Sequence, residues 1–479
     1  MKKILVANRG EIAIRIIRAA QELGYTAVAI YETPDTEALH VRIADEAVWL
    51  GDGPRKDYLD IAKVIKAARR SGADAIHPGY GFLAENPEFA KACEDAGIVF
   101  IGPTSEVITN LGNKVIAREI MAGAGIPMVP GTPNLAAGDE GVKQALAFAA
   151  EYGYPIMLKA TAGGGGRGIR RIEDDGQMKE QIPMARAEAK AAFNNDNVYL
   201  EKVVINPKHI EVQVIADTFG HVVHLGSRDC SIQRRNQKLV EIAPSMIEDQ
   251  TIVDSICETA VKAASAANYT NAGTVEFLVD KDLNYYFMEI NTRVQVEHTV
   301  TEMVTGIDIV RTQIKLAFGK KLLFDQEDVQ IRGHAIEMRI NAEDPKNNFM
   351  PEGGKTVDIY RSPGGYGVRL DGFVYQGYTI PEEYDSLLVK LTVHGYSWNE
   401  TVDRLKRCLK NYVIIGPKTT IPFYLALVDD PDFREGDFDT SYLETHSQLL
   451  DYDEQDTEIN KLAKLIAEIH YKEENSYAI

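Results

Sequence analysis

Residues 274–298 read TVEFLVDKDLNYYFMEINTRVQVEH, two alternating runs of apolar and polar residues around a polar cluster at positions 280–284. Alternation with a period of two on both sides of a turn predicts a β-hairpin. If the turn centres on Asp282 and Leu283, Glu276 and Glu289 lie directly opposite each other. Their Cβ atoms would then be roughly 5 Å apart, and like charges at that distance repel. The hairpin therefore predicts a cation between the two carboxylates.

Asn291 falls on the same face of this hairpin as Glu276 and Glu289. The three side chains together offer oxygen ligands, and the phosphates of a substrate could fill the remaining coordination positions. Hard oxygen ligands of this kind suit magnesium better than zinc. The alternative is a solvated edge hairpin whose outward positions are polar but bind no ion.

The composition is that of an ordinary globular chain: 479 residues, 45% hydrophobic and 26% charged, which is enough for two to four domains. The formal charge of −19 argues against a nucleic-acid partner, which would need a basic surface. The start of the chain does not resemble a signal peptide, and no apolar run reaches membrane-spanning length. The cysteines are scattered without a CxxC pair, which favours a reducing compartment: Cys93, Cys230, Cys257 and Cys408. We therefore expect a cytoplasmic enzyme.

The first quarter of the chain alternates strand-like and helix-like segments. Short apolar runs at 4–7, 26–30, 48–50, 75–77 and 98–101 are separated by helical patterns. This order predicts a doubly wound parallel sheet over residues 1–112. Gly10 stands alone where a dinucleotide site would need GxGxxG, which argues against NAD. The GYGF segment at 79–82 follows a strand, where such sheets place ligand contacts.

A run of glycines interrupts two predicted strands at 154–160 and 169–172. A P-loop would need GK[ST] leading into a helix, and neither feature is present. A strand, a glycine loop and a second strand instead predict a mobile flap whose backbone amides close over phosphates. The alternative is a flexible hairpin tip. Four consecutive glycines lose much conformational entropy on ordering, so a functional flap is favoured.

Three later stretches add polar groups. The sequence RDCSIQRRNQK at 228–238 is dense in cations and amides; alone it would be a solvated surface, but beside the carboxylates and the flap it predicts an anion-binding wall. His209 and Glu211 share one face of a strand at 208–213, and Glu337, Arg339 and Asn341 share one face of a strand at 333–341. A turn-rich segment begins at 344–345, and from the loop at 362–365 to about 444 the signals are strand-rich, with one late helix near 398–410. The last segment, acidic at 451–458 and amphipathic at 459–469, predicts a tail helix that packs on the body or docks a partner.

Several of these segments together resemble the biotin carboxylases of the ATP-grasp superfamily. The matching motifs are ILVANRGEI at 4–12, AIHPGYGFLAEN at 75–86, GGGGRG at 163–168, RDCSIQRRNQK at 228–238, MEINTRVQVEHTVTE at 288–302 and YDSLLVK at 384–390. The resemblance implies a multidomain α/β and α+β chain. Its parts would be an amino-terminal domain at 1–112, an ATP-grasp core at 113–330 with a mobile lid near 131–203, an α+β carboxyl-terminal domain at 331–446, and an acidic linker and tail helix at 447–479.

The resemblance also implies an activity: the ATP-dependent carboxylation of biotin by bicarbonate through carboxyphosphate, with Mg²⁺ or Mn²⁺, giving carboxybiotin, ADP and phosphate. ATP would be bound by side-chain and backbone groups of the core: Lys114, Lys159, Gly163, Gly164, Gly165, Gly166, Glu201, Lys202, Val203, Val204, His209, Gln233, Asn236, Glu276, Leu278 and Glu289. The metal ion would be bound by Glu276, Glu289 and Asn291. Phosphoryl transfer depends mainly on positioning and charge neutralisation, which suits this set.

The same resemblance assigns the remaining substrates. Bicarbonate would contact Lys238, Arg293, Gln295, the backbone at Val296 and Arg339, and the general base would be Glu297. Lys238, Arg293, Glu297 and Arg339 form the expected catalytic set. Tyr80 and Arg339 would contact biotin, with Arg339 stabilising the biotin enolate; a fixed guanidinium suits a planar oxyanion.

Two positions depart from the family pattern. Asn236 stands in RRNQK where many members have histidine, so a phosphate or ribose contact would become a neutral amide hydrogen bond. We expect activity to survive with altered ATP affinity or pH dependence. Val203 and Val204 stand where the hinge residues are often larger or aromatic, which predicts a looser adenine pocket.

The partners follow from what the sequence does not contain. It has no biotin-accepting Met-Lys-Met motif and no carboxyltransferase domain, so we expect biotin on a separate carrier protein and the carboxyltransferase on another chain. A homodimer is the family expectation. The chain would then be one component of a pyruvate, 2-oxoglutarate or acetyl-CoA carboxylase. The alternatives are another ATP-grasp ligase that activates a different carboxylate, and a non-catalytic nucleotide-binding scaffold.

Overall fold

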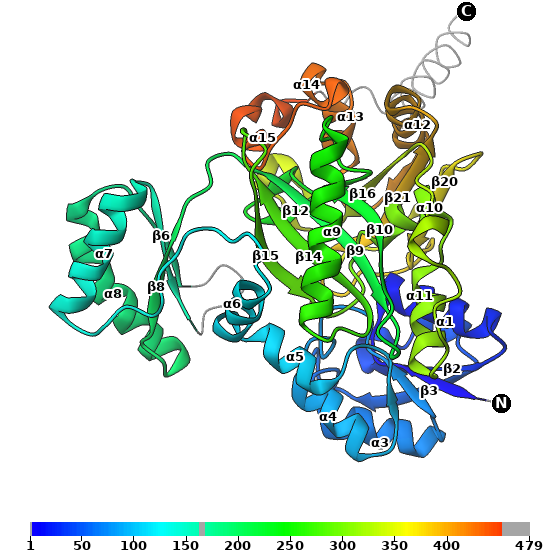
Figure 1. Ribbon diagram of the computed structural model, residues 1–479. Helices are drawn as coiled ribbons and strands as arrows, with labels where there is room; N and C mark the ends of the chain where they lie inside the picture. Colours follow the sequence, from blue (N-terminus) through cyan, green and yellow to red (C-terminus); the bar gives the residue numbers. More distant parts are fainter. Residues whose placement is uncertain (1, 162–167, 453–479) are drawn as a thin grey trace, which may run out of the picture.

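A five-stranded parallel sheet, in the order β3-β2-β1-β4-β5, forms the amino-terminal part of the computed structural model, which describes residues 2–161 and 168–452 (Figure 1). Its strands are β1 Lys3–Val6, β2 Thr26–Glu32, β3 Glu46–Gly51, β4 Ala75–His77 and β5 Val99–Phe100. The helices of this region are α1 Gly10–Glu22, α2 Leu39–Ile43, α3 Ile61–Ser71, α4 Pro87–Asp95, α5 Ser105–Gly112 and α6 Lys114–Gly123. Ile4, Leu5 and Val6 are fully buried, as expected for a central parallel strand covered on both faces. The predicted doubly wound parallel sheet is confirmed.

The strand order reverses between β1 and β4, so the loops after these two strands lie side by side. Parallel open sheets place their ligand contacts at such a point. Asn8 ties the two loops together: its Nδ2 donates to the carbonyls of Pro78 and Tyr80, both at 2.7 Å. Tyr80 lies in the loop after β4, and Glu11 lies in the first turn of α1, which follows β1. Both residues are therefore at the edge of the sheet where β1 and β4 end.

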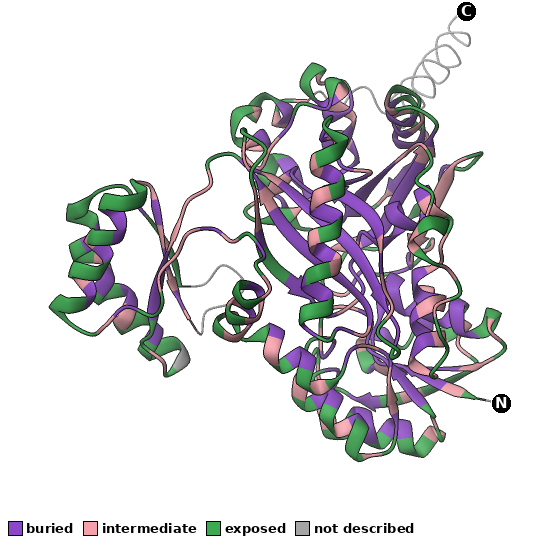
Figure 2. Ribbon diagram, viewed as in Figure 1, coloured by how far each residue is buried: buried purple, intermediate pink, exposed green. Residues whose placement is uncertain are grey.

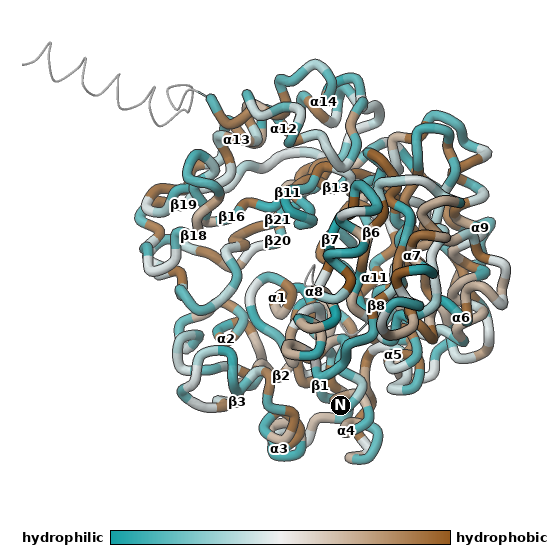
Figure 3. The backbone as a smooth tube through the Cα atoms, turned by 90° about the vertical axis from the view of Figure 1, so that its left-hand side faces the viewer, coloured by the Kyte–Doolittle hydropathy of each residue, from teal (hydrophilic) through white to brown (hydrophobic). Residues whose placement is uncertain are grey.

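A small antiparallel sheet, in the order β7-β6-β8, stands apart from the body of the molecule at the left of Figure 1. It consists of β6 Ile156–Ala160, β7 Ile169–Ile172 and β8 Val198–Lys202, covered by α7 Asp139–Tyr152 and α8 Asp175–Phe193. Figure 3 shows the hydrophobic central strand β6 and the more polar edge strand β7. The chain enters and leaves this unit side by side, where the Lys202 amide donates to the Pro130 carbonyl at 2.8 Å. This unit lies within residues 131–203, the range over which a lid is predicted, and it is called the lid below. The predicted glycine flap at 163–166 lies outside the described residues.

An eight-stranded antiparallel sheet, in the order β15-β14-β9-β10-β13-β16-β21-β20, is the centre of the molecule (Figure 1). Its strands are β9 Lys208–Ala216, β10 Val222–Asp229, β13 Val240–Ala243, β14 Asn271–Val279, β15 Tyr285–Asn291, β16 His334–Asn341, β20 Val368–Gly372 and β21 Leu387–Gly395. Because β16 pairs with β13, the sheet runs without a break from the predicted ATP-grasp core into the predicted carboxyl-terminal domain. Figure 2 shows that most of this sheet is buried.

The two faces of this sheet differ in chemistry. Val275, Phe277 and Val279 share an apolar cluster with α9 Gln250–Ala266, so the face predicted to be apolar packs against that helix. The opposite face carries polar side chains at the intervening positions, including Glu276 and Glu211. That face is turned toward the segment leading into α10 His298–Thr305, which is followed by α11 Ile309–Ala317. Strand alternation alone therefore separates the core from the polar site.

The remaining elements are short strands outside the large sheets and the helices of the carboxyl-terminal region. The short strands are β11 Gln233–Arg234, β12 Gln237–Lys238, β17 Glu343–Asp344, β18 Met350–Pro351, β19 Ile359–Arg361 and β22 Val413–Ile415, and the helices are α12 Trp398–Asn411, α13 Ile421–Leu427, α14 Pro431–Glu435 and α15 Tyr442–Thr445. The prediction of a single late helix is wrong, because three α-helices follow α12 within the described ranges. Each of the three is too short for helical periodicity to be detected, and the proline in the first turn of α13 and of α14 is easily taken for a break.

Three observations complete the description. The predicted tail helix at 459–469 lies outside the described residues. Within the described part of the chain no helix combines the length and the apolar composition needed to cross a bilayer. All four cysteines are buried and unpaired.

Candidate functional site

The hairpin predicted from the sequence is present as β14 and β15, and Glu276 pairs directly with Glu289 across it. The ladder shifts register immediately after Glu276, so Phe277 faces Phe287 and Met288 is left without a cross-strand partner. Glu276 in turn pairs with Glu211 on β9, and Glu211 pairs with Arg228 on β10. Three carboxylates and one guanidinium therefore stand in a row across four neighbouring strands.

Glu276 is buried and accepts hydrogen bonds from four donors. Its Oε1 accepts from Asn291 Nδ2 at 2.6 Å, from Gln295 Nε2 at 3.0 Å and from Lys238 Nζ at 3.2 Å, and its Oε2 lies 3.1 Å from His209 Nε2. Burial opposes ionisation, but Lys238 and His209 outweigh it and hold the pKa of Glu276 below its usual range. Glu276 is therefore a carboxylate at any physiological pH.

Glu289 has the opposite electrostatic character. Its side chain lies at the outer edge of the hairpin and is exposed. Its pKa is nevertheless raised, mainly because nearby protein groups partly desolvate the carboxylate and secondly because Glu276 repels it. Lys114 at the start of α6 counteracts this repulsion in part. A divalent cation between Glu276 and Glu289 would remove the conflict, so the donor chemistry fits Mg²⁺ or Mn²⁺.

Asn291, the third predicted metal ligand, is buried beside Glu276 but presents its nitrogen to that carboxylate. Its Oδ1 accepts from the Arg293 guanidinium at 3.2 Å. A half-turn of the terminal amide would present the oxygen instead, at the cost of these two hydrogen bonds. Asn291 therefore lies at the site, in an orientation that a bound cation would have to reverse.

Lys238 is the cation at the centre of the cluster. Its Nζ contacts Glu211 closely and lies 2.8 Å from Glu297 Oε1 and 3.2 Å from Glu276 Oε1. Desolvation would lower the pKa of Lys238, but attraction to Glu276 and Glu297 is larger and raises it. One ammonium group therefore links the hairpin carboxylates to the predicted general base.

The strand that carries Lys238 is reached through a tight turn. β11 and β12 pair around the two residues Arg235 and Asn236, which have φ values of +50° and +64°. Two left-handed residues between two strands form a type I′ turn, in which asparagine is favoured. Asn236 therefore suits its backbone conformation, and its side chain is exposed at the tip of this hairpin.

Gln233 orients the ring of His209, which contacts the second carboxylate oxygen of Glu276. The Gln233 amide donates to His209 Nδ1 at 2.7 Å, which leaves the ring proton on Nε2, facing Glu276. His209 is buried, so the structure places it against a predicted metal ligand rather than at the surface. Leu278 pairs with His209 in the β9–β14 ladder and is half-buried.

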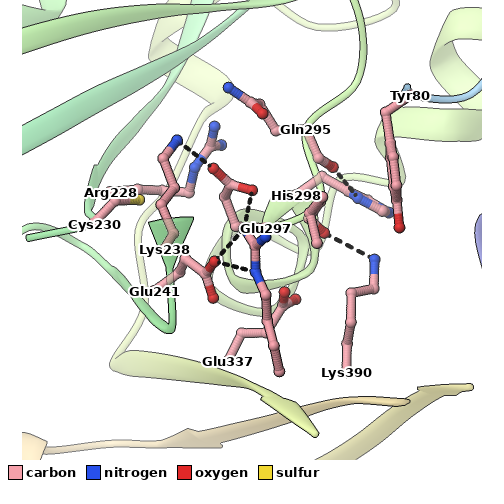
Figure 4. A network of polar contacts seen from close by, with 12 residues as sticks. Tyr80, Arg228, Cys230, Lys238, Glu241, Gln295, Glu297, His298, Glu337 and Lys390 are labelled. Carbon is pink, nitrogen blue, oxygen red and sulfur yellow. Dashed lines mark hydrogen bonds and ion pairs between the residues drawn. The ribbon is translucent and has the colours of Figure 1, made fainter. Parts of the chain in front are cut away.

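Glu297, the predicted base, caps α10 and is completely buried between two cations (Figure 4). Its Oε1 accepts from Lys238, and its Oε2 accepts from Arg339 at 3.2 Å. Burial would raise the pKa of Glu297, but Lys238 and Arg339 outweigh it and hold the pKa well below the usual range. A carboxylate held in this way gains basicity when a substrate anion draws either cation away.

Arg339 is held by a second carboxylate that the sequence interpretation missed. Its Nε donates to Glu241 Oε1 at 2.7 Å, and the same oxygen lies 2.5 Å from Nη2, the nitrogen that also donates to Glu297. Glu241 and Glu297 therefore both hold the Nη2 group of Arg339. The glutamate inside the apolar stretch LVEIA indicates from the sequence that a buried ion pair exists, but it does not identify the partner residue.

Arg293 lies in the same segment as the base. Its Nε donates to Glu85 at 2.9 Å, and its Nη1 donates to Gln295 Oε1 at 2.8 Å. Gln295 is buried and bonds Glu276, while Val296 is half-buried. Arg293, Gln295 and Val296 thus line one turn between β15 and α10.

Several of the predicted nucleotide contacts lie on the lid and on the connection that leaves it. Lys159 contacts Glu201 closely, and Glu201 also accepts from Arg118 at 2.7 Å. Lys202 points elsewhere: its Nζ donates to the Gly153 and Tyr154 carbonyls at 3.1 and 3.0 Å. Val203 and Val204 follow as half-buried residues of the connection. The structure therefore brings Lys159 and Glu201 together and directs the Lys202 side chain away from them.

Tyr80 lies on the opposite side of the cluster. Its hydroxyl donates to Glu11, a buried carboxylate whose other oxygen is 3.2 Å from Lys390 Nζ. Neither Glu11 nor Lys390 carries a role in the sequence interpretation, although both lie inside quoted motifs. A single lysine in the apolar run LLVKLTV was the available signal.

Family models match three consecutive parts of the chain. Residues 1–108 match the amino-terminal domain of biotin carboxylase, residues 113–324 match the ATP-binding domain of the carbamoyl-phosphate synthase L chain, and residues 337–445 match the carboxyl-terminal domain of biotin carboxylase.

Individual relatives agree with these models. The chain is 50% identical to biotin carboxylase 1 of Bacillus subtilis over 94% of its own length and 99% of that protein. It is also 50% identical to the 2-oxoglutarate carboxylase small subunit of Hydrogenobacter thermophilus, over 95% of each chain. The crystal structure of the biotin carboxylase domain dimer of that carboxylase, in complex with MgADP, ADP and bicarbonate, superposes with a TM-score of 0.89 at 50% identity and covers 95% and 99% of the two chains.

Proposed function

The chain belongs to the biotin carboxylase family, and on that premise we propose that its polar cluster carboxylates biotin with ATP and bicarbonate. The family, the ATP-grasp fold and the ligase activity are those that the sequence motifs predict. The observation that carries the proposal is the position of Glu297, which is buried between Lys238 and Arg339. Lys238 also contacts Glu276 and so links the two carboxylates.

The nucleotide binds between the lid and the central sheet. Lys159 on the lid and Lys114 on α6 supply positive charge to its phosphates. The backbone amides of the glycines at 163–166 bind the same phosphates. Glu276, Glu289 and Asn291 hold the divalent cation; when bound, Mg²⁺ or Mn²⁺ neutralises charge on the transferred phosphoryl group. The relief of the Glu276–Glu289 repulsion supports this assignment.

Bicarbonate binds on the other side of Lys238. Arg293, Lys238, Gln295 and the Val296 backbone hold the anion, and Glu297 accepts its proton. The deprotonated oxygen attacks the γ-phosphate and gives carboxyphosphate and ADP. The low pKa of Glu297 in the structure supports this order: as Lys238 turns to the substrate oxygens, the carboxylate loses a counter-ion and becomes a stronger base.

Biotin binds where Arg339 meets the amino-terminal domain. Carboxyphosphate breaks down to carbon dioxide and phosphate, phosphate removes the proton from the ureido nitrogen, and Arg339 stabilises the enolate. The double support of Arg339 by Glu241 and Glu297 suits a guanidinium that must keep one orientation. Tyr80 contributes to the same pocket.

The function is tested by the release of ADP. Release should require bicarbonate and should rise when free biotin is added. Release driven equally well by other carboxylates would favour another ATP-grasp ligase, and no release with ATP, magnesium, bicarbonate and biotin would leave a nucleotide-binding scaffold. The complete set Lys238, Arg293 and Glu297 argues against the scaffold.

We also propose that the protein acts in the cytoplasm as a homodimer, with a biotin carrier and a carboxyltransferase on other chains. The dimeric Hydrogenobacter structure and the name of the matching small subunit support this arrangement. The four buried thiols are compatible with a reducing compartment. Relatives with different names match this chain at the same identity, so identity does not select the molecule that finally receives the carboxyl group. The carboxyltransferase chain that co-purifies with this one identifies that acceptor.

A further inference from the structure

The turn that presents Glu297 is held by two buried side chains that bond its backbone rather than any substrate. His298 Nδ1 lies 2.8 Å from the Gln295 carbonyl, and Lys390 Nζ donates to the Val296 carbonyl at 2.8 Å. His298 and Lys390 are both fully buried. Lys390 thus fixes the peptide unit that immediately precedes the Cα of Glu297.

Lys390 reaches this turn from a different part of the chain. On β21 it pairs with Arg339 of β16 on one side and with Asp371 of β20 on the other. The two cations therefore stand next to each other on one face of the sheet, with Arg339 directed to the carboxylate of Glu297 and Lys390 to the backbone before it. Figure 4 shows Lys390 on the Tyr80 side of Glu297.

Glu11 connects Lys390 to the proposed biotin side. Its Oε2 lies 3.2 Å from Lys390 Nζ in the geometry of an ion pair, its Oε1 accepts from the Tyr80 hydroxyl, and the Lys390 ammonium is 5.9 Å from the centre of the Tyr80 ring. Burial raises the pKa of Glu11 to about 7, although Lys390 opposes the shift. The carboxylate is therefore close to changing charge in the neutral range.

Stability alone gives no reason for this pair. Desolvation would lower the pKa of Lys390, and attraction to the carboxylates of Glu11, Glu337 and Asp371 together raises it. A buried pair of this kind is often no more stable than apolar residues of the same volume. Its value lies in geometry: one ammonium group joins helix α1 of the amino-terminal domain, the turn before α10 and the carboxyl-terminal strands.

We propose that Glu11 and Lys390 are positioning residues that set the Glu297 turn for bicarbonate and transmit the binding of biotin at Tyr80 to that turn. The inference rests on the proposed function of Glu297 and Tyr80. A ligand that moves the Tyr80 hydroxyl changes the charge that Glu11 presents to Lys390, and hence how Lys390 divides its interactions between the Glu11 carboxylate and the Val296 carbonyl. Biotin thereby adjusts the base without touching it.

The pH profile distinguishes this role from simple support. The groups that face Glu11 are Lys390 and Arg369, which favour its charged form, and Asp371, which opposes it, with the Tyr80 hydroxyl as its hydrogen-bond donor. We expect the stimulation of ADP release by biotin to fall as Glu11 gains its proton, below a pH of about 7. Glu11→Gln cannot titrate, so its stimulation should be low and independent of pH across the same range.

The experiment compares Lys390→Met, Glu11→Gln and a matched control, Asp35→Asn. Asp35 forms a buried pair with Arg9 at 2.7 Å in the same amino-terminal domain, and its carboxylate bonds Arg9 and Tyr58 rather than the Glu297 turn. ADP release is measured with and without free biotin over a range of bicarbonate and ATP concentrations, together with the melting temperature. For Lys390→Met we expect KM for bicarbonate to rise about tenfold or more while KM for ATP stays within about twofold. For Glu11→Gln we expect the ratio of rates with and without biotin to fall about tenfold.

The outcomes separate the two levels of the proposal. A wild-type protein without bicarbonate-dependent ADP release would overturn the proposed function itself. An active wild type, with Glu11→Gln folded and its biotin stimulation and pH profile unchanged, overturns this inference alone, even if Lys390→Met does not fold. Asp35→Asn should lower the melting temperature and leave the stimulation ratio unchanged; a loss of the ratio there too would show a general effect of a broken buried pair and overturn the inference.

Discussion

Glu241 on β13 and Glu337 on β16 lie directly opposite each other, and both side chains are fully buried. They repeat, near the centre of the sheet, the pairing of Glu276 and Glu289 at its edge. Desolvation first, with repulsion from neighbouring carboxylates among the smaller contributions, raises the pKa of each. Arg339 neutralises Glu241 directly, whereas Glu337 accepts a hydrogen bond from a neutral hydroxyl. Opposed carboxylates thus recur in this sheet: Glu276 and Glu289 suit a metal ion, and Glu241 with its partner Glu337 receives a guanidinium.

The first prediction follows from this pair. A carboxyl group with a raised folded-state pKa stabilises the protein least when it is ionised, so stability falls as the pH rises above the usual glutamate range. Glu241→Gln should therefore raise the melting temperature at pH 8 and lose this advantage toward pH 5, with a gain of about 1 kcal/mol at pH 8. Because Arg339 loses one of its two supports, biotin carboxylation should fall about tenfold. Thermal unfolding and carboxybiotin formation are measured on the same samples, with Glu400→Gln on α12 as control. A variant that is both less stable and fully active would contradict the assignment.

Arg339 is expected to act on biotin more than on ATP. Arg339→Ala should reduce biotin carboxylation about a hundredfold or more, because the enolate loses its counter-charge. The substitution also leaves Glu241 and Glu297 without this cation, so Arg339→Lys, which keeps the charge and loses the fork, is measured beside it. Arg434→Ala, on α14 and paired with Asp403, is the matched control. Carboxylation at the wild-type rate in a folded Arg339→Ala protein would remove Arg339 from the mechanism.

Glu289 is expected to determine the magnesium requirement. Glu289→Gln keeps the shape of the hairpin and removes one of the two opposed charges, so the magnesium concentration for half-maximal ADP release should rise about tenfold. Asp282→Asn removes a charge at the exposed turn of the same hairpin and serves as control. Identical magnesium titrations for both variants and the wild type would exclude the metal role of Glu289.

Asn236 offers a test of the departure from the family pattern. Histidine tolerates the left-handed conformation, so Asn236→His should cost less than about 1 kcal/mol of stability. If this side chain approaches ATP, KM for ATP in the variant should fall as the pH drops through about 6.5, where imidazole gains its charge. The wild type should show no such inflection. Asn194→His, at an exposed left-handed position in the lid, controls for the substitution itself. The same pH profile in both variants would place Asn236 away from the nucleotide.

The sequence predicts those features of the site that depend on local order. The opposition of Glu276 and Glu289 needs only strand parity and the position of one turn, and the separation of Phe277 from Glu276 onto two faces follows from the same period. The parallel sheet of the amino-terminal domain is largely local, because three of its pairings join consecutive strands and only the pairing of β1 with β4 does not. These predictions are confirmed.

The contacts of Lys238, Arg339 and Lys390 could not be predicted in this way. They depend on which distant strands become neighbours, as when β13 from the middle of the chain pairs with β16. A charged side chain in an apolar strand indicates a buried partner but does not identify it, so Glu241 and Lys390 had no role in the sequence interpretation. The substrates were inferred from the family resemblance. The side chains that hold the proposed substrate-binding residues in place, such as Glu241 and Lys390, were found only in the structure.

The unbroken central sheet has a consequence for exchanging parts between related enzymes. The regions that match separate family models end at residue 324 and resume at residue 337, which suggests a natural place to join two parents. A junction there would make β13 of one parent pair with β16 of the other along a full edge, and a misfit would expose two unpaired strands that promote aggregation. In the described ranges, the chain passes between the lid and the body at two adjacent connections. The exchangeable unit of this protein is therefore the lid, while the carboxyl-terminal third must be inherited together with the strands it completes.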